Sequence, residues 1–249
     1  MPKLSDLKVK LFTDGADKAQ ILEMAKQPWI RGFTTNPSLL KKAGVSDYEA
    51  YARDLVAAVP NRHISFEVFS DDIPEMVAQG RVIASWGKNV FVKLPVTNTR
   101  GEPLFEAVRA LSHEGVNINM TAIFTSEQVA RAVDALAGGA PACVSVFAGR
   151  LADFGIDYRP IVRDAVARAS GTANVEIIWA STREAFNVLE ADEMGCHIIT
   201  APADILKKLP AFGAKTAAEL SLDGVKAFRA DAVAAGLSLQ LAPRADAAE

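Results

Sequence analysis

Lys93 is the residue whose type and setting most strongly indicate chemistry, because it lies inside the run Asn-Val-Phe-Val-Lys-Leu-Pro-Val-Thr at 89–97. An ammonium group is strongly hydrated, and apolar surroundings disfavour its charged form. The segment alone allows two interpretations. Lys93 either ends a strand with its ammonium in water, or it is a desolvated amine that attacks a carbonyl carbon to form a Schiff base.

Other apolar segments of the chain also contain isolated polar residues. They are Asp14, Asn36, Glu67, Asn117, Asn119, Thr121, Ser145 and Ser181. In the stretch 117–121 the polar residues alternate with apolar ones, so we expect them to share one face of a strand. Acids, amides and hydroxyls are costly to bury unless they form a network. Taken together, these residues favour a catalytic site that contains Lys93.

Short apolar runs alternate with helical patterns along the chain. The predicted strands are 9–14, 32–36, 63–69, 90–96, 116–124, 143–149, 175–181 and 197–201. The predicted helices between and after them are 16–26, 37–43, 47–59, 72–86, 101–113, 126–138, 156–170 and 182–194, and C-terminal helices are predicted at 206–209 and 216–235. Asp47, Ser126 and Thr182 are the expected N-caps, and Gly115 and Gly195 the expected turn residues.

Eight strand–helix repeats without a linker predict an α/β fold, a single (β/α)8 barrel over 1–249 with extra C-terminal helices. An open doubly wound sheet is the alternative, but no glycine-rich dinucleotide turn follows the first strand. In a barrel, polar residues at the strand ends meet at the C-terminal mouth, where such folds hold their sites. The polar segment 242–249 is predicted to be a frayed tail.

The composition narrows the possible partners and settings. The chain has 249 residues, half of them hydrophobic, and a net charge of −3, so it has no basic footprint for nucleic acid. No apolar run reaches the roughly 18 residues of a membrane span, and no signal region opens the chain. Cys143 and Cys196 lie in apolar runs and are expected to be reduced core residues of a cytoplasmic protein. The three histidines show no zinc spacing, and no motif indicates a cofactor.

Five segments, in order, resemble the transaldolase family, in particular its short microbial members related to fructose 6-phosphate aldolases. They are Phe-Thr-Thr-Asn-Pro-Ser-Leu at 33–39, Phe-Val-Lys-Leu-Pro-Val-Thr at 91–97, Asn-Met-Thr-Ala-Ile-Phe at 119–124, Ser-Val-Phe-Ala-Gly-Arg at 145–150 and Ala-Ser-Thr-Arg at 180–183. The resemblance extends over about 11–209. It places the Schiff-base lysine on the fourth strand, whereas other Schiff-base aldolases usually carry theirs on the sixth.

The resemblance implies catalytic roles for four residues. Lys93 attacks the ketone of a sugar phosphate, and the imine serves as the electron sink for cleavage of the neighbouring carbon–carbon bond. Glu67 and Thr121, through a water molecule, handle the proton transfers of imine formation. Asp14 is the acid/base at the hydroxyl where the bond breaks. A dihydroxyacetone enamine then attacks an acceptor aldehyde.

The resemblance also implies substrate-binding roles, without any metal. Asn36 and Asn119 bind the hydroxyls of the three-carbon fragment and the imine nitrogen, while Thr34 and Ser145 orient the fragment. The remaining set, Arg150, Ser181 and Arg183, binds the phosphate; two guanidinium groups suit bidentate recognition of an oxyanion. Val146 stands for the usual proline and Thr182 for an apolar residue, so a sulfonated or deoxy sugar is an alternative donor.

The competing function within the family is aldol cleavage that releases free dihydroxyacetone. The resemblance assigns the aldolases a glutamine at the position of Glu67 and a tyrosine at that of Phe147. A phenol can protonate the enamine, whereas phenylalanine cannot, so transfer is favoured. A non-catalytic sugar-phosphate sensor and a pyridoxal phosphate enzyme are the alternatives from other classes. Short family members are often rings assembled through C-terminal helices, so a homo-oligomer is expected.

Overall fold

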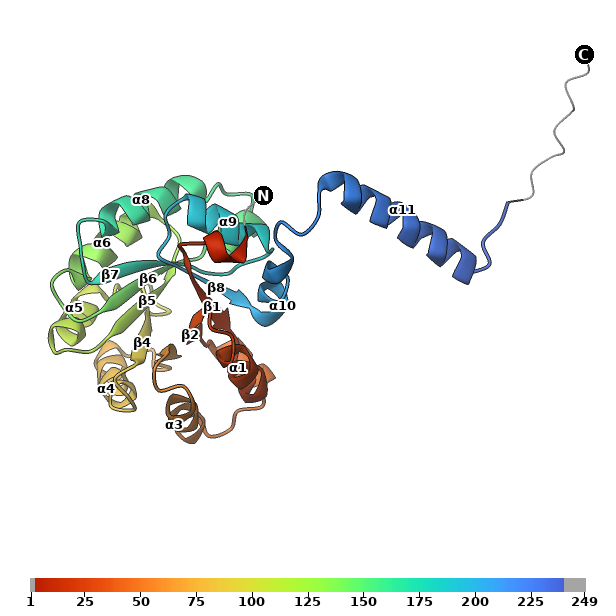
Figure 1. Ribbon diagram of the computed structural model, residues 1–249. Helices are drawn as coiled ribbons and strands as arrows, with labels where there is room; N and C mark the ends of the chain where they lie inside the picture. The colour runs from red at the N-terminus through yellow and green to blue at the C-terminus, as the bar shows by residue number, and fades with distance from the viewer. Residues whose placement is uncertain (1–2, 240–249) are drawn as a thin grey trace, which may run out of the picture.

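The eight strands close into a parallel barrel in the order β1 to β8, as the sequence predicted (Figure 1). The computed structural model describes residues 3–239. The strands are β1 (Lys10–Asp14), β2 (Ile30–Thr34), β3 (His63–Glu67), β4 (Val90–Pro95), β5 (Ile118–Ile123), β6 (Ala142–Val146), β7 (Val175–Trp179) and β8 (Ile198–Pro202). The tail expected at 242–249 lies outside the described residues.

Helices cover the outside of the barrel (Figure 1). They are α1 (Lys18–Ala25), α2 (Pro37–Lys42), α3 (Tyr48–Ala58), α4 (Ile73–Ala84), α5 (Phe105–His113), α6 (Ser126–Leu136), α7 (Ala148–Asp153), α8 (Arg159–Ala169), α9 (Phe186–Glu193) and α10 (Ala203–Leu206), with short 3-10 helices η1 (Leu4–Asp6) and η2 (Leu209–Ala211). The last helix is α11 (Ala217–Ala234). No helix among residues 3–239 is long and apolar enough to cross a membrane.

Several predicted bounds differ from the structure by a few residues, the C-terminal helix predicted at 206–209 among them, since α10 ends at Leu206. Three further predictions were wrong. The sixth strand ends at Val146 rather than at residue 149, because α7 begins at Ala148. The N-cap of α6 is Thr125 rather than Ser126: its hydroxyl accepts from the Gln128 amide. Thr182 caps no helix. The two turn glycines, both with positive φ, and the Asp47 cap are confirmed.

Successive side chains of each strand point alternately to the helices outside the barrel and into its interior. On β4, Val92 and Leu94 face the large apolar core that the barrel shares with the helices, and both are fully buried. The opposite face of the strands points into the barrel, where Phe12, Cys143 and Ile178 belong to a smaller apolar cluster. Parallel strands covered on both faces are expected to be apolar on both. Polar residues on the inner face are therefore the exceptions that need partners.

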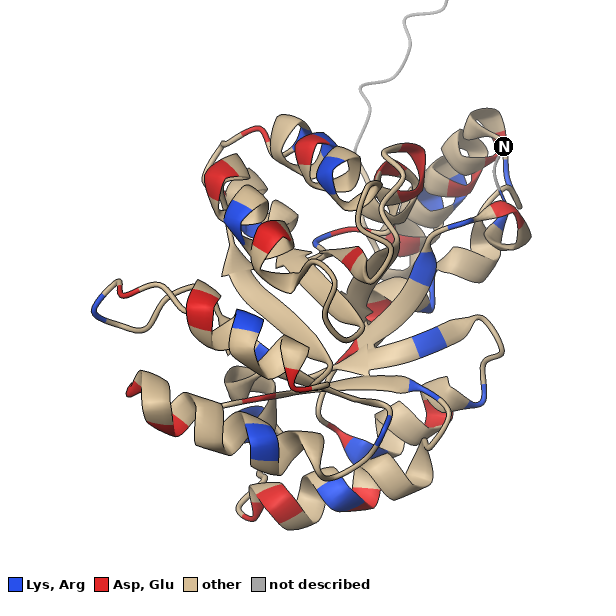
Figure 2. Ribbon diagram, turned by 90° about the vertical axis from the view of Figure 1, so that its left-hand side faces the viewer, with Lys and Arg blue, Asp and Glu red and all other residues tan. Residues whose placement is uncertain are grey.

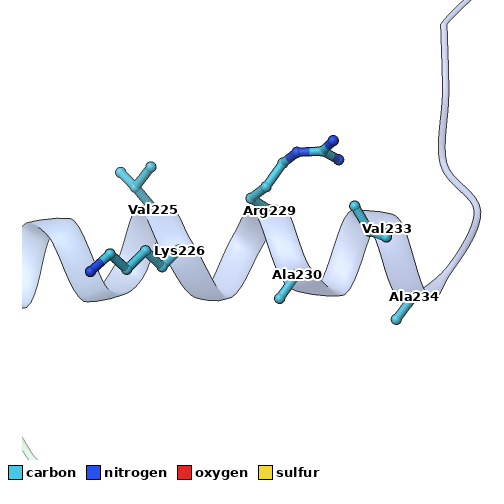
Figure 3. Close-up of a pocket in the computed structure, with 6 residues that line it drawn as sticks. All are labelled: Val225, Lys226, Arg229, Ala230, Val233 and Ala234. Atoms are coloured by element: carbon cyan, nitrogen blue, oxygen red, sulfur yellow. The ribbon is translucent and has the colours of Figure 1, made fainter.

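The helix α11 stands away from the barrel (Figure 1). None of its residues is buried, although Leu220, Leu222, Val225, Phe228 and Val233 are large apolar side chains. Figure 3 shows side chains of its C-terminal half, Val225 and Arg229 among them, with no other described part of the chain packed against them. On the side shown in Figure 2, acidic and basic residues are interspersed along the helices.

Candidate active site

Lys93 lies inside the barrel and not at its surface. It is paired in register with Glu67 on the neighbouring strand β3, and its Nζ lies 2.7 Å from Glu67 Oε1. The two side chains are only 9% and 8% exposed. Lys93 Nζ also donates a hydrogen bond to the carbonyl oxygen of Thr35 at 2.6 Å. The interpretation of Lys93 as a strand-end residue with its ammonium in water is therefore wrong.

Two carboxyl groups on the inner face of the barrel feel the charge of this lysine. Burial raises the pKa of Glu67 above its ordinary value, although the charge of Lys93 opposes the shift. Burial likewise raises the pKa of Asp14, again against the charge of Lys93. A raised pKa brings a carboxyl group closer to the pH at which it can both give and take a proton. The inner face of the barrel thus combines an amine with two candidate proton carriers.

The carboxylate of Asp14 is held by a hydrogen-bond network at the ends of β1, β2 and β8. Thr34 Oγ1 donates to Asp14 Oδ1 at 2.8 Å and lies 2.5 Å from Thr200 Oγ1. Asn36 Nδ2 donates to Asp14 Oδ2 at 3.5 Å, while Asn36 Oδ1 accepts from the Leu39 amide as the N-cap of α2. The first turn of α2 and the carboxylate of Asp14 together fix the side chain of Asn36.

The amide of Asn119 lies beside Lys93, its register partner on β5. Asn119 is fully buried, and its Oδ1 accepts from Ser145 Oγ at 2.7 Å. Its Nδ2 donates to Ser65 Oγ at 3.0 Å. The structure therefore places Asn119 beside the lysine and Ser145 beside Asn119. Asn117 belongs elsewhere: it binds the carbonyls of Lys88 and Val90, before and at the start of β4.

The strand β5 deforms where Thr121 points into the barrel. Its pairing with β6 shifts between Met120 and Ile123, and Ala122 adopts a positive φ of 60°. Left-handed backbone at a residue other than glycine is strained and is common at functional sites. Thr121 Oγ1 is buried and has no hydrogen-bond partner among the described residues. That hydroxyl is free to bind a water molecule or substrate.

The three residues expected to bind an anion lie where β7 meets α7. Gly149 is required there, because a Cβ atom on it would lie 1.6 Å from the carbonyl oxygen of Ser181. Ser181 itself has a positive φ of 66°. Arg183 is engaged by Asp153, which accepts from its Nε at 2.9 Å and from Nη2 at 2.6 Å. The guanidinium of Arg150 lies 5.3 Å from the centroid of the Phe147 ring.

The two departures from the family motifs do not face this region. Val146 is fully buried in the core between barrel and helices. Thr182 is 3% exposed, and its Oγ1 donates to the carbonyl oxygen of Thr200 at 2.8 Å. Thr182 therefore ties the loop after β7 to β8 rather than lining the anion site.

Four residues near the site were missed from the sequence. They are Thr35, whose Oγ1 donates to Glu67 Oε2 at 3.1 Å, together with Ser65, Thr200 and Asp153. Ser65 and Thr200 lie at alternate positions on strands that were predicted correctly, so strict alternation identifies them. Neither of the other two carries a local signal, since Thr35 follows β2 and Asp153 is in the unpredicted helix α7.

A family model described as transaldolase/fructose-6-phosphate aldolase matches residues 11–239. A probable transaldolase of Thermoanaerobacter sp. (strain X514) is 36% identical over 232 residues, which is 93% of this chain and 100% of that protein. Probable transaldolases of Dehalococcoides mccartyi and Clostridium acetobutylicum are 36% and 38% identical over 202 residues, with 81% of this chain covered and 90% and 89% of theirs. The chain belongs to the transaldolase and fructose-6-phosphate aldolase family of enzymes.

Proposed function

We propose that the protein is a transaldolase that uses Lys93 to form a Schiff base. In this reaction a dihydroxyacetone unit passes from a ketose phosphate, sedoheptulose 7-phosphate or fructose 6-phosphate, to an aldose phosphate. The observation that carries the proposal is the buried contact of Lys93 with Glu67, since a carboxyl group 2.7 Å from an amine is placed to exchange protons with it while the amine attacks a ketone. Family membership supports the same chemistry.

The other inner-face residues then have separate tasks. Glu67 handles the proton transfers that form and hydrolyse the imine, together with the Thr121 hydroxyl, which has no hydrogen-bond partner within residues 3–239. Asp14, held by Thr34, removes the proton from the hydroxyl at the bond that breaks. Asn119 and the remaining hydroxyls orient the three-carbon fragment. Arg150, Ser181 and Arg183 bind the anionic end of the sugar.

Borohydride trapping tests the proposal. The protein is incubated with fructose 6-phosphate, reduced, digested and mapped by mass spectrometry. We expect one reduced three-carbon adduct, on Lys93. An active enzyme without an adduct on that residue contradicts the mechanism.

Aldol cleavage is the second candidate function, and Phe147 separates it from transfer. Its ring lies 5.3 Å from that of Phe124 and offers no hydroxyl to protonate an enamine. The enamine is therefore expected to persist until an acceptor aldehyde arrives. Turnover of fructose 6-phosphate without acceptor, at the rate seen with erythrose 4-phosphate, favours the aldolase instead. A sulfonated or deoxy sugar is a further candidate donor; fructose 6-phosphate with the highest kcat/KM among the donors excludes it.

We further propose that the protein, one barrel domain over its whole length, assembles into a homo-oligomer in the cytoplasm through α11. The exposed apolar residues of α11 have no partner among the described residues, and an apolar surface of this kind marks an interaction site. Phe228→Asp is expected to reduce the mass seen by light scattering. Val82→Asp, at an exposed apolar residue of α4, is the matched control and keeps the original mass.

A further inference from the structure

A chain of hydrogen bonds connects Asn119 to the N-terminal end of the barrel. From Asn119 Nδ2 it continues to Ser65 Oγ at 3.0 Å, and from Ser65 Oγ to His63 Nε2 at 2.9 Å. His63 and Ser65 are alternate residues of β3, on the same inward face as Glu67. Ser65 therefore contacts an amide beside Lys93 directly, and His63 contacts it through Ser65.

The ring of His63 is held firmly in place. It stacks on Phe91 with centroids 3.6 Å apart and an interplanar angle of 8°, and Phe12 meets it edge-on at 4.8 Å. Burial, with a smaller effect of the charge of Lys10, lowers the pKa of His63 to about 3. The imidazole is therefore neutral at physiological pH, with one nitrogen that donates and one that accepts.

The direction of each hydrogen bond follows from the number of protons available. Ser65 Oγ accepts from the amide of Asn119, so its own proton must point elsewhere, and His63 Nε2 is the nitrogen in contact with it. If Ser65 donates its proton to that nitrogen, His63 carries its own proton on Nδ1. With the proton on Nε2 instead, His63 donates to Ser65, and the Ser65 proton then finds an acceptor on Asn119 only if the amide turns its oxygen towards it.

The other neighbour of Asn119 cannot fix the amide orientation. Ser145 lies at the opposite end of the amide, 2.7 Å from Oδ1, and a hydroxyl can either donate or accept. Ser145 therefore tolerates both orientations of the amide. With His63 Nε2 as the acceptor, the proton of Ser65 is satisfied and the amide keeps its N–H towards Ser65, so the whole chain of hydrogen bonds is consistent with one amide orientation.

We infer that His63 and Ser65 are positioning residues that fix the side-chain amide of Asn119 for the substrate fragment on Lys93. The inference rests on the proposed function, in which Asn119 contacts that fragment. The amide then presents its second N–H to the fragment in every turnover. Neither His63 nor Ser65 touches the substrate; both act through Asn119.

Substitutions of His63 separate positioning from packing. His63→Phe keeps a ring on Phe91 but removes the acceptor, whereas His63→Gln loses the ring but restores an amide oxygen near Ser65. We expect His63→Phe and Ser65→Ala to lower kcat/KM about tenfold, and His63→Gln to stay within about threefold of the unchanged protein. A packing role predicts the reverse order, so activity of His63→Phe above that of His63→Gln overturns the inference. His113→Gln, on the exposed end of α5, is the control.

The protonated nitrogen of His63 is measured without any substrate. Long-range proton–nitrogen NMR spectra of a protein with three histidines resolve each ring. We expect His63 to carry its proton on Nδ1 and to shift in Ser65→Ala; a proton on Nε2 overturns the inference. Failure of the proposed function gives a different result. The wild-type protein then shows neither turnover nor a borohydride adduct, while the NMR signals of His63 remain as expected.

Discussion

Two ion pairs, one inside the barrel and one at its rim, show how burial changes what a charged contact does. Lys93 and Glu67 are 9% and 8% exposed, whereas Arg183 and Asp153 are 46% and 44% exposed. The free energy needed to desolvate two charges exceeds the free energy of their attraction unless the geometry of the pair is very good. An exposed pair costs little and contributes little. The inner pair is therefore best explained by chemistry, and the outer pair by an arginine that can exchange its partner.

The largest expected effect comes from removing the inner amine. Lys93→Met is expected to lower kcat/KM by more than about 1,000-fold, because the covalent intermediate no longer forms. Lys10→Met is the matched control. Lys10 also lies on an inner strand face and contacts Glu176 at 2.5 Å, but its side chain is 42% exposed. Steady-state assays of transfer to erythrose 4-phosphate compare the two variants; equal losses contradict a special role for Lys93.

Removing the inner carboxylate is expected to have a smaller effect. Glu67→Gln keeps the shape of the side chain and a contact with Lys93 but cannot transfer a proton. We expect kcat to fall about 100-fold, the usual contribution of general acid/base catalysis. Borohydride trapping is expected to give the same adduct more slowly. A normal trapping rate shows that Glu67 is not the proton carrier for imine formation.

Glu67→Gln is also expected to change how stability depends on pH. Because burial raises the pKa of Glu67 in the folded state, the folded protein binds this proton more tightly than the unfolded chain does. Its contribution to the unfolding free energy is complete below the unfolded value of 4.5 and is lost as the pH rises through the folded value. The unchanged protein should therefore lose stability relative to Glu67→Gln as the pH rises above 4.5. Urea unfolding at several pH values checks the sign.

At the rim of the barrel, loss of Arg183 should weaken substrate binding and leave the rate of the chemical step nearly unchanged. Arg183→Gln is expected to raise the KM for the sugar phosphate about tenfold and to change kcat little, since an anion contact far from the breaking bond acts on both ground and transition states. Assays at saturating and limiting donor separate the two constants. A fall in kcat with constant KM places Arg183 nearer the chemistry than we propose.

The inner pair was easier to predict from the sequence than the rim pair. Lys93 and Glu67 each interrupt an apolar strand, and the period of the strand gives the face on which each lies. The partner of Arg183 was not predictable, because Asp153 is 30 residues away in a six-residue helix. The sequence predicts a strand up to residue 149 and a loop after it in place of this helix. Short helices have too few turns to show a helical period.

Hydroxyl residues were missed for a different physical reason. Threonine and serine fit a pleated strand, so Ser65 and Thr200 look ordinary in their segments even though they lie on the inward face. Thr182 was misassigned because serine and threonine often cap helices, while here the hydroxyl binds a carbonyl of the distant strand β8. Sequence patterns locate strands and buried charges well. The hydrogen-bond partner of a hydroxyl can lie on a distant strand, and this partner becomes apparent only in the closed barrel.

The smallest expected effect comes from a change to Asp153, and it tests directly whether Arg183 can exchange this carboxylate for a substrate anion. Asp153 accepts from Arg183 and holds the guanidinium in place, but the same carboxylate competes with an incoming anion. Asp153→Asn should therefore lower the KM for the sugar phosphate about threefold and shift the melting temperature by less than about 2 °C, because exposed pairs contribute little to stability. The gain should shrink as salt is added, since salt screens the repulsion that was removed. A higher KM instead means that Asp153 positions Arg183 more than it competes with the substrate.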